Sequence, residues 1–152
     1  MDDAGPIRKE IFIEAAPEEV FPYLTENKKY LLWMGVAVEL DPRPGGVFKV
    51  DPNGRDVIFG EFVEVIPPRR VVFTWGWNKP DHSMPAGSSR VEIDLLPHND
   101  GTLVRLQHFG VSRSLRDSHE GGWMHYLNRL RLVALGRDPG PDPFGTLETQ
   151  HG

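Results

Sequence analysis

The sequence predicts an α+β fold, in which an antiparallel sheet of seven strands is combined with two short helices after the first strand and a long C-terminal helix. Alternation of apolar and polar residues, broken by turn sequences, continues for about seventy residues from Val36 and is typical of successive antiparallel strands. Helical spacing of apolar residues then begins near residue 115. The 16 glycines and 14 prolines also favour short elements joined by tight turns over a helix bundle.

The N-terminal segment predicts one strand followed by two short helices. Ile7–Ile13 has a mixed alternating pattern that stops before Pro17. Proline is suited to the first turn of a helix, and Glu18 and Glu19 suit the positive end of the helix dipole. The helical pattern then breaks, and apolar residues return within Lys28–Met34. We therefore expect a first helix from Pro17 and a second helix within Lys28–Met34.

Six further strands are expected between the short helices and the C-terminal helix. Phe73, Trp75 and Trp77 alternate along one of them and so share one face. In the last strand His108 alternates with aliphatic residues and is expected to face the interior. The six predicted strands are Val36–Leu40, Gly46–Asp51, Val57–Ile66, Arg70–Trp77, Ser89–Leu96 and Thr102–Phe109.

Two acidic residues disturb the alternation within one of these strands. Glu61 and Glu64 are three positions apart, so a regular strand would place them on opposite faces. Either a β-bulge lies between them or one of the two carboxylates points inward. The pattern of this strand alone leaves both alternatives open.

The C-terminal helix is predicted over Leu115–Leu135, with Ser114 as its N-cap and Gly136 as its terminator. A helix of this length spans about 31 Å and can cross a whole sheet. Gly121 and Gly122 lie inside it, where each glycine costs about 1 kcal/mol relative to alanine. A close approach to the sheet, room for a ligand, a kink, or a helix whose regular part begins only after Gly122 would account for them.

The length predicts a single domain, 1–152, with a core over about 7–136 and a Pro- and Gly-rich tail, 137–152, without regular elements. The net charge of −5 has the wrong sign for nucleic-acid binding through overall charge. The polar start is unlike a signal peptide, and no window is apolar enough to span a membrane. We expect a cytoplasmic protein that contacts neither nucleic acid nor membrane.

The sequence offers no convincing metal or catalytic motif. It contains no cysteine, so thiolate nucleophiles and cysteine-ligated metals are excluded. His119 and His125 are six positions apart, whereas a zinc-binding helix needs two histidines four apart on one face. No serine lies in a nucleophile elbow. We therefore predict no metal, no cofactor and no assigned catalytic residue.

The order of the predicted elements resembles the START-like, or SRPBCC, superfamily, whose members have the helix-grip fold. The resemblance covers about residues 7–144 and is closest to the branch named after the C-terminal domain of the activator of the heat-shock protein 90 ATPase. The residues that carry it are Ala16-Pro17, Val20-Phe21, Leu24-Thr25, Trp33, Asp41 to Gly46, Gly60 before Pro67-Pro68, Phe73-Thr74-Trp75, Gly101-Thr102, His108, and His119 with Gly122-Trp123.

This resemblance implies a curved sheet wrapped around the C-terminal helix, with a space between them that family members often use for an apolar ligand. We expect this chain to bind a small hydrophobic or aromatic molecule there. The alternative is that the same aromatic side chains simply pack the core. The residues expected to line the space are Trp33, Phe73, Trp75, Trp77, His108, His119, Trp123 and Tyr126.

Two other functions remain open from the sequence. The resemblance also suits a protein-interaction module with a chaperone- or stress-related regulatory role, acting through its exterior as a monomer or homodimer. An enzyme of the cyclase, dehydratase or hydrolase kind could use His108 or His119, together with an inward Glu64, as acid–base groups. A filled interior would favour the interaction module, and converging polar groups in an open cavity would favour the enzyme.

Overall fold

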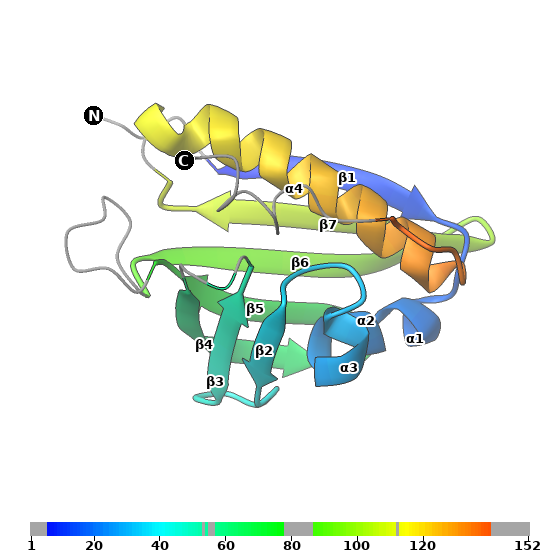
Figure 1. Cartoon of the computed structure of the whole chain (residues 1–152). Helices are drawn as coiled ribbons and strands as arrows, with labels where there is room; N and C mark the ends of the chain where they lie inside the picture. Colours follow the sequence, from blue (N-terminus) through cyan, green and yellow to red (C-terminus); the bar gives the residue numbers. More distant parts are fainter. Residues whose placement is uncertain (1–5, 53, 55–56, 78–86, 112, 141–152) are drawn as a thin grey trace.

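A computed structural model describes residues 6–52, 54, 57–77, 87–111 and 113–140 of the chain (Figure 1). Its strands form one seven-stranded sheet in the order β1-β7-β6-β5-β4-β3-β2, and every neighbouring pair is antiparallel. The elements are β1 (Ile7–Ile13), α1 (Pro17–Val20), α2 (Pro22–Thr25), α3 (Asn27–Tyr30), β2 (Ala37–Leu40), β3 (Val47–Asp51), β4 (Ile58–Ile66), β5 (Arg70–Trp75), β6 (Ser89–His98), β7 (Gly101–Phe109) and α4 (Arg113–Ala134).

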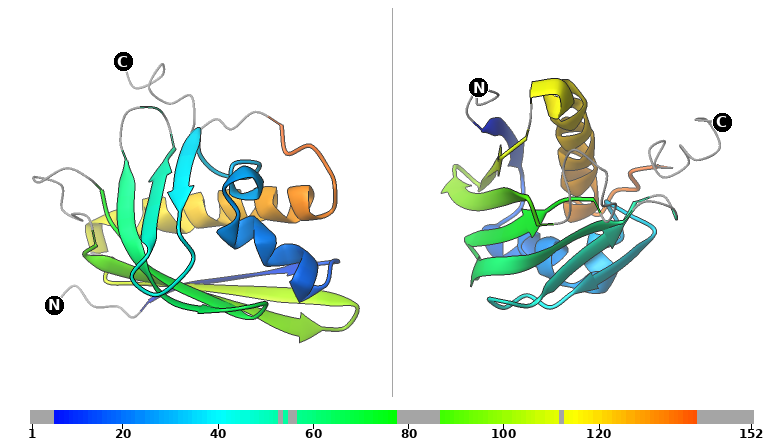
Figure 2. Two further views of the ribbon diagram at one scale, coloured as in Figure 1. Left: turned by 90° about the horizontal axis from the view of Figure 1, so that it is seen from below. Right: turned by 90° about the vertical axis from the view of Figure 1, so that its left-hand side faces the viewer.

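The sheet curves, and α4 lies along its concave side (Figure 2). The strands from β2 to β7 follow one another as successive antiparallel neighbours, and β1 returns to pair with β7 at the far edge. The apolar inner faces of these strands and of α4 form the core. The expected curved sheet around a C-terminal helix is confirmed.

The segment after β1 contains three helices of four residues each, so the prediction of two was wrong. Pro22 divides the first predicted helix: proline has no N–H to continue a helical ladder, but it fits the first turn of α2. The last helix is also shorter than the predicted Lys28–Met34. It ends at Tyr30, and a turn leads to Gly35, whose φ of +95° no longer fits a helix.

The predicted strands match the observed ones to within two residues at each end. β1 has the predicted bounds, and β5 is the strand that ends earlier than expected, at Trp75 instead of Trp77. Trp77 pairs with Ile58 through an isolated bridge beyond the end of β5. The tail residues 137–140 contain no regular element, as predicted, and residues 141–152 lie outside the described part of the chain.

A β-bulge in β4 decides the direction of its two acids. Phe62 pairs with Phe73, and Glu64 pairs with Val72, so Val63 is the extra residue on this strand. The bulge restores Glu64 to the outer face. An inward Glu64, which the enzymatic alternative required, is therefore wrong.

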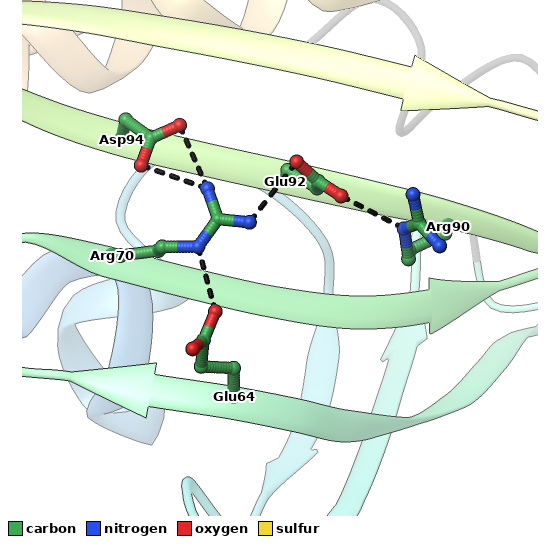
Figure 3. A network of polar contacts seen from close by, with 5 residues as sticks. All are labelled: Glu64, Arg70, Arg90, Glu92 and Asp94. Carbon is green, nitrogen blue, oxygen red and sulfur yellow. Dashed lines mark hydrogen bonds and ion pairs between the residues drawn. The ribbon is translucent and has the colours of Figure 1, made fainter.

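On the outer face, Glu64 belongs to an ion-pair network centred on Arg70 (Figure 3). The Arg70 guanidinium donates to Glu64 at 2.7 Å, to Glu92 at 3.1 Å and to Asp94 at 2.9 Å. Arg90 forms an ion pair with the other oxygen of Glu92 at 2.9 Å. These contacts raise the pKa of Arg70 further above its ordinary value and keep this face of β4, β5 and β6 charged and solvated.

Helix α4 begins at Arg113, so Ser114 lies inside its first turn and the predicted N-cap at Ser114 was wrong. The predicted terminator is confirmed, because Gly136 has a φ of +75° and the Arg137 N–H donates to the Leu132 carbonyl at 2.8 Å. No described helix is both long and apolar enough to cross a membrane.

The C-terminal half of α4 is fastened to the segment that contains the short helices. The Tyr23 hydroxyl donates to the Val133 carbonyl at 3.2 Å, and Arg129 Nε donates to the Trp33 carbonyl at 3.0 Å. The indole of Trp33 in turn donates to the Tyr23 carbonyl at 2.8 Å. These polar contacts fix one end of the helix over the sheet without involving its N-terminal half.

We predict that Gly60→Ala destabilises the fold by about 1–3 kcal/mol, because its new Cβ overpacks the β4–β5 ladder. That Cβ would lie 2.0 Å from the Thr74 carbonyl oxygen, a backbone atom that cannot move aside alone. Gly121→Ala is the matched control, since nothing lies within 4 Å of its Cβ position and alanine is the better helix former. Urea denaturation midpoints that are equal for the two variants would contradict this prediction.

Candidate functional site

One part of the interior is a continuous row of neighbouring aromatic rings. Trp33 lies 4.8 Å from Tyr30 between ring centroids, and Tyr30 lies 6.2 Å from Phe48. Phe48 stacks on Phe73 at 3.9 Å, and Phe73 lies 6.3 Å from Trp75. All five side chains are buried. Trp33 and Phe73, two of the predicted lining residues, therefore pack the core at this end of the sheet.

The row ends in a second group of rings beneath the N-terminal half of α4, here called the Trp75 cluster, which consists of Trp75, His108, His119 and Trp123. The Trp75 ring centroid lies 5.0 Å from Trp123 and 5.7 Å from His108. His108 lies 5.7 Å from His119 and 6.0 Å from Trp123. The structure thus brings together four of the eight predicted lining residues, from β5, β7 and α4.

The other two predicted lining residues have different surroundings. Trp77 is half-buried beyond the end of β5. Tyr126 is buried one turn after Trp123, and its ring meets His125 edge-on at 4.9 Å. The prediction that His108 faces the interior is confirmed, since its side chain is fully buried.

A chain of hydrogen bonds joins α4 to three strands. Trp123 Nε1 donates to His108 Nδ1 at 3.1 Å. An indole nitrogen can only donate, so Nδ1 is the accepting nitrogen and the neutral ring carries its proton on Nε2. That N–H donates to Ser89 Oγ at 2.8 Å, and the Ser89 hydroxyl donates to the Trp75 carbonyl at 2.7 Å. Each of the three hydrogen bonds therefore has one defined donor and one defined acceptor.

The surroundings of His108 keep its imidazole neutral. The pKa of His108 is lowered to about 3, mainly by burial and to a smaller extent by the charge of the neighbouring His119. With its Nε2 already protonated, His108 cannot accept the Ser89 proton, and that proton is committed to the Trp75 carbonyl. The pair therefore lacks the arrangement in which a histidine base activates a serine nucleophile.

Ser89 is the member of this chain that the sequence analysis missed. It precedes Val91, Ile93 and Leu95 at intervals of two and so continues the inward stripe of β6. A hydroxyl at the end of an apolar stripe requires a polar partner, which was the available signal. Its partners depend on the pairing of Ser89 with Trp75 across strands, and the pattern of one strand does not contain that register.

The Trp75 cluster contains one buried donor that its neighbours leave unused. Trp75 is 3% exposed, and its Nε1 is buried without a hydrogen-bond partner among the described residues. A buried N–H left in this state costs about 1–3 kcal/mol. Native interiors seldom retain such a group unless a water or a ligand supplies the acceptor.

The two glycines of α4 lie beside this cluster. The helix runs through both from Arg113, so a regular part that begins only after Gly122 is wrong as an explanation. A close approach to the sheet is wrong as well, since an added Cβ at either position meets nothing within 4 Å. Gly122 is half-buried, three positions after His119 and four before Tyr126, and so shares their side of the helix. Gly121 is exposed.

Within the described part of the chain, no three His, Asp or Glu side chains are grouped so that they could hold a metal ion. The expectation that the protein binds neither metal nor cofactor stays a prediction. The Trp75 cluster therefore offers apolar ring surfaces, one unused N–H donor and the half-buried imidazole of His119.

Comparison with protein families gives a match over residues 14–134 to the model described as "Activator of Hsp90 ATPase homolog 1-like protein". The chain belongs to this family. The match begins directly after β1 and runs to the end of α4, and so includes every member of the Trp75 cluster. No curated protein matches the chain.

Solved structures of the activator-like family and its neighbours have the same fold. An AHSA1-like protein from Rhizobium etli is 44% identical with a TM-score of 0.73, covering 95% of this chain and 92% of that one. The Aha1 dimer from Colwellia psychrerythraea is 21% identical, covers 85% and 95%, and has a TM-score of 0.74. DynU16, from the dynemicin biosynthetic locus, is 20% identical with a TM-score of 0.77, and this chain spans 50% of its length and matches over 90% of its own. The predicted START-like family and helix-grip fold are confirmed.

We predict that acid weakens this activator-like fold partly through His108. Its pKa of about 3 in the folded protein lies below its value of about 6.5 in an unfolded chain, so between these values the unfolded chain binds the extra proton. The contribution is complete above pH 6.5 and is lost as the pH falls towards 3. His108→Gln retains a donor and an acceptor but does not titrate, so it should lower the pH slope of the unfolding free energy by up to about 1.4 kcal/mol per unit.

Urea denaturation at pH 7, 6, 5 and 4 measures this difference. His98→Gln is the control for the same replacement at an exposed position, the end of β6. A slope that His108→Gln leaves unchanged would show that His108 titrates alike in the folded and unfolded states.

Proposed function

We propose that this protein binds a small hydrophobic or aromatic molecule between the sheet and α4, at the Trp75 cluster. The observation that carries the proposal is the buried Trp75 Nε1, which has no partner among the described residues. A core that served only stability would gain from an apolar ring at this position or from an acceptor beside it. A bound molecule that accepts a hydrogen bond from this N–H removes the cost.

The surroundings of the cluster support an apolar ligand. Trp75 and Trp123 supply two indole faces, and aromatic side chains are the usual walls of small-molecule sites. Gly122 adds open space next to Trp123 on the half-buried side of α4, where most residue types would place a side chain. Glycine at this position costs the helix about 1 kcal/mol of stability relative to alanine.

The enzymatic alternative is weaker at this site. Glu64 bonds to Arg70 on the outer face, and His108 is held neutral with both ring nitrogens engaged. His119 is the remaining titratable group of the cluster, and one such group does not make an acid–base pair. Ligand binding without a catalysed reaction needs no acid–base pair and therefore fits these side chains better.

A second candidate is a protein-interaction role, and exposed apolar side chains near the end of α3 favour it. Leu31 is 37% exposed, Leu32 52% and Val36 55%, all within a few residues of one another. Such a surface suits a partner protein or a second copy of the chain. If this role is the main one, Leu32→Ser should abolish association while leaving the interior unchanged.

Ligand binding is tested by comparing two alanine variants of α4 with the neutral apolar dye Nile red. Gly122→Ala places a methyl group in the space beside Trp123 and should weaken dye binding about tenfold, which corresponds to 1.4 kcal/mol. Gly121→Ala is exposed and should bind the dye as the wild type does. Both substitutions should stabilise the helix alike, so a difference between them reports the site and not the fold.

Dye emission and quenching of tryptophan fluorescence measure the affinity, and ligand-dependent melting temperatures provide a second readout. Equal affinities of the two alanine variants would place the dye elsewhere and refute the proposed site. Absence of binding by Nile red and by a broad set of apolar compounds would refute the proposed function and favour the protein-interaction role.

A further inference from the structure

The structure also points to the chemical class of the ligand, an inference that rests on the proposed function. We infer that the molecule held at the Trp75 cluster carries a neutral hydrogen-bond acceptor, such as a ketone, ester or amide carbonyl oxygen, which accepts the Trp75 Nε1 proton. Two properties of the cluster define this acceptor: which of its hydrogen-bonding groups are available, and what charge its surroundings tolerate.

The available group is a donor. His108 accepts from Trp123 and donates to Ser89, and the Ser89 proton goes to the Trp75 carbonyl. These bonds occupy both ring nitrogens of His108 and the indole of Trp123. Among the described residues, the buried side-chain atom without a partner is Trp75 Nε1. A ligand that completes the cluster must therefore present an acceptor, and a hydrocarbon or a ligand with donors alone leaves the N–H unpaired.

The charge of the acceptor follows from the side chains that would surround it. The cluster consists of two indoles and two imidazoles and contributes no Arg or Lys. Burial is the main cause that holds His108 in its neutral form, so loss of water in this cluster opposes a charge of either sign, whereas the second cause, the charge of His119, opposes a positive one. A carboxylate would lose its water on entering this cluster, whereas a carbonyl loses little and gains the hydrogen bond from Trp75.

The neighbouring rings restrict the ligand further. Trp75 and Trp123 are tilted by 49° with centroids 5.0 Å apart, so their faces offer apolar contact on more than one side. Contact with aromatic faces contributes about 0.5–1.5 kcal/mol beyond the area buried. An aromatic or conjugated carbonyl compound combines this contact with the acceptor that Trp75 requires.

The test uses three probes with one ring system: naphthalene, 2-acetylnaphthalene and 2-naphthoate. In the wild type at pH 7.5, 2-acetylnaphthalene should bind about three- to tenfold tighter than naphthalene, the value of one neutral hydrogen bond. 2-Naphthoate should bind more weakly than the ketone. Trp75→Phe keeps an aromatic ring but removes the N–H, so it should abolish the preference for the ketone and leave naphthalene binding within about twofold.

A second measurement follows ligand binding in the wild-type protein. Proton–nitrogen NMR spectra show the indole N–H of each tryptophan, and the signal that Trp75→Phe removes belongs to Trp75. This signal should move downfield with 2-acetylnaphthalene and stay in place with naphthalene. The signal of Trp33, whose N–H already donates to the Tyr23 carbonyl, serves as the internal control.

The outcomes separate this inference from the proposed function. Equal binding of naphthalene and 2-acetylnaphthalene, with no shift of the Trp75 signal, would overturn the acceptor inference while binding itself stands; a water molecule would then satisfy Trp75. Tightest binding of 2-naphthoate would overturn the neutral charge assigned to the acceptor. Failure of all three probes and of Nile red would overturn the proposed function.

Discussion

The hydrogen-bond chain from the Trp123 indole to the Trp75 carbonyl is the interaction on which the site depends. It crosses from α4 to β7, β6 and β5 through His108 and Ser89, so it links helix and sheet in one line. Because the indole can only donate, the direction of every bond in the chain follows from its first member. The N-terminal half of α4 is thereby held by polar contacts in an otherwise apolar interior, where such contacts are most directional.

This chain also accounts for the unused donor beside it. The Trp75 backbone is held by Ser89, and its ring packs against Trp123, so the indole cannot turn its N–H to solvent. The protein therefore keeps a rigid donor at a fixed place in an apolar setting. Preorganisation of this kind favours binding, because no side chain has to be ordered when a ligand arrives.

Much of the fold was predictable because strand alternation is a strong local signal, as the bounds of β1 show. Prediction failed where the outcome depends on a neighbour. The direction of Glu64 required the pairing of β4 with β5, and the role of Ser89 required the pairing of β5 with β6. The proline that divides the first helix, Pro22, can be read from the sequence. The division was missed because the residues on both sides of it are helical. The sequence identified site residues by their side-chain type, but their hydrogen-bonding partners became known only from the pairing of the strands in the structure.

The aromatic residues of the interior, treated as one set by the sequence analysis, have two different roles. Around Phe48 the rings stack closely, at 3.9 Å from Phe73, and the hydroxyl of Tyr30 is satisfied by Met34 at 3.4 Å. Around Trp75 a donor stays unpaired, and the helix opposite omits a side chain at Gly122. Both features cost stability, and a residue chosen for packing would remove either of them. In the proposed function these two features, at the end of an otherwise complete aromatic row, belong to a ligand site and not to a packed core.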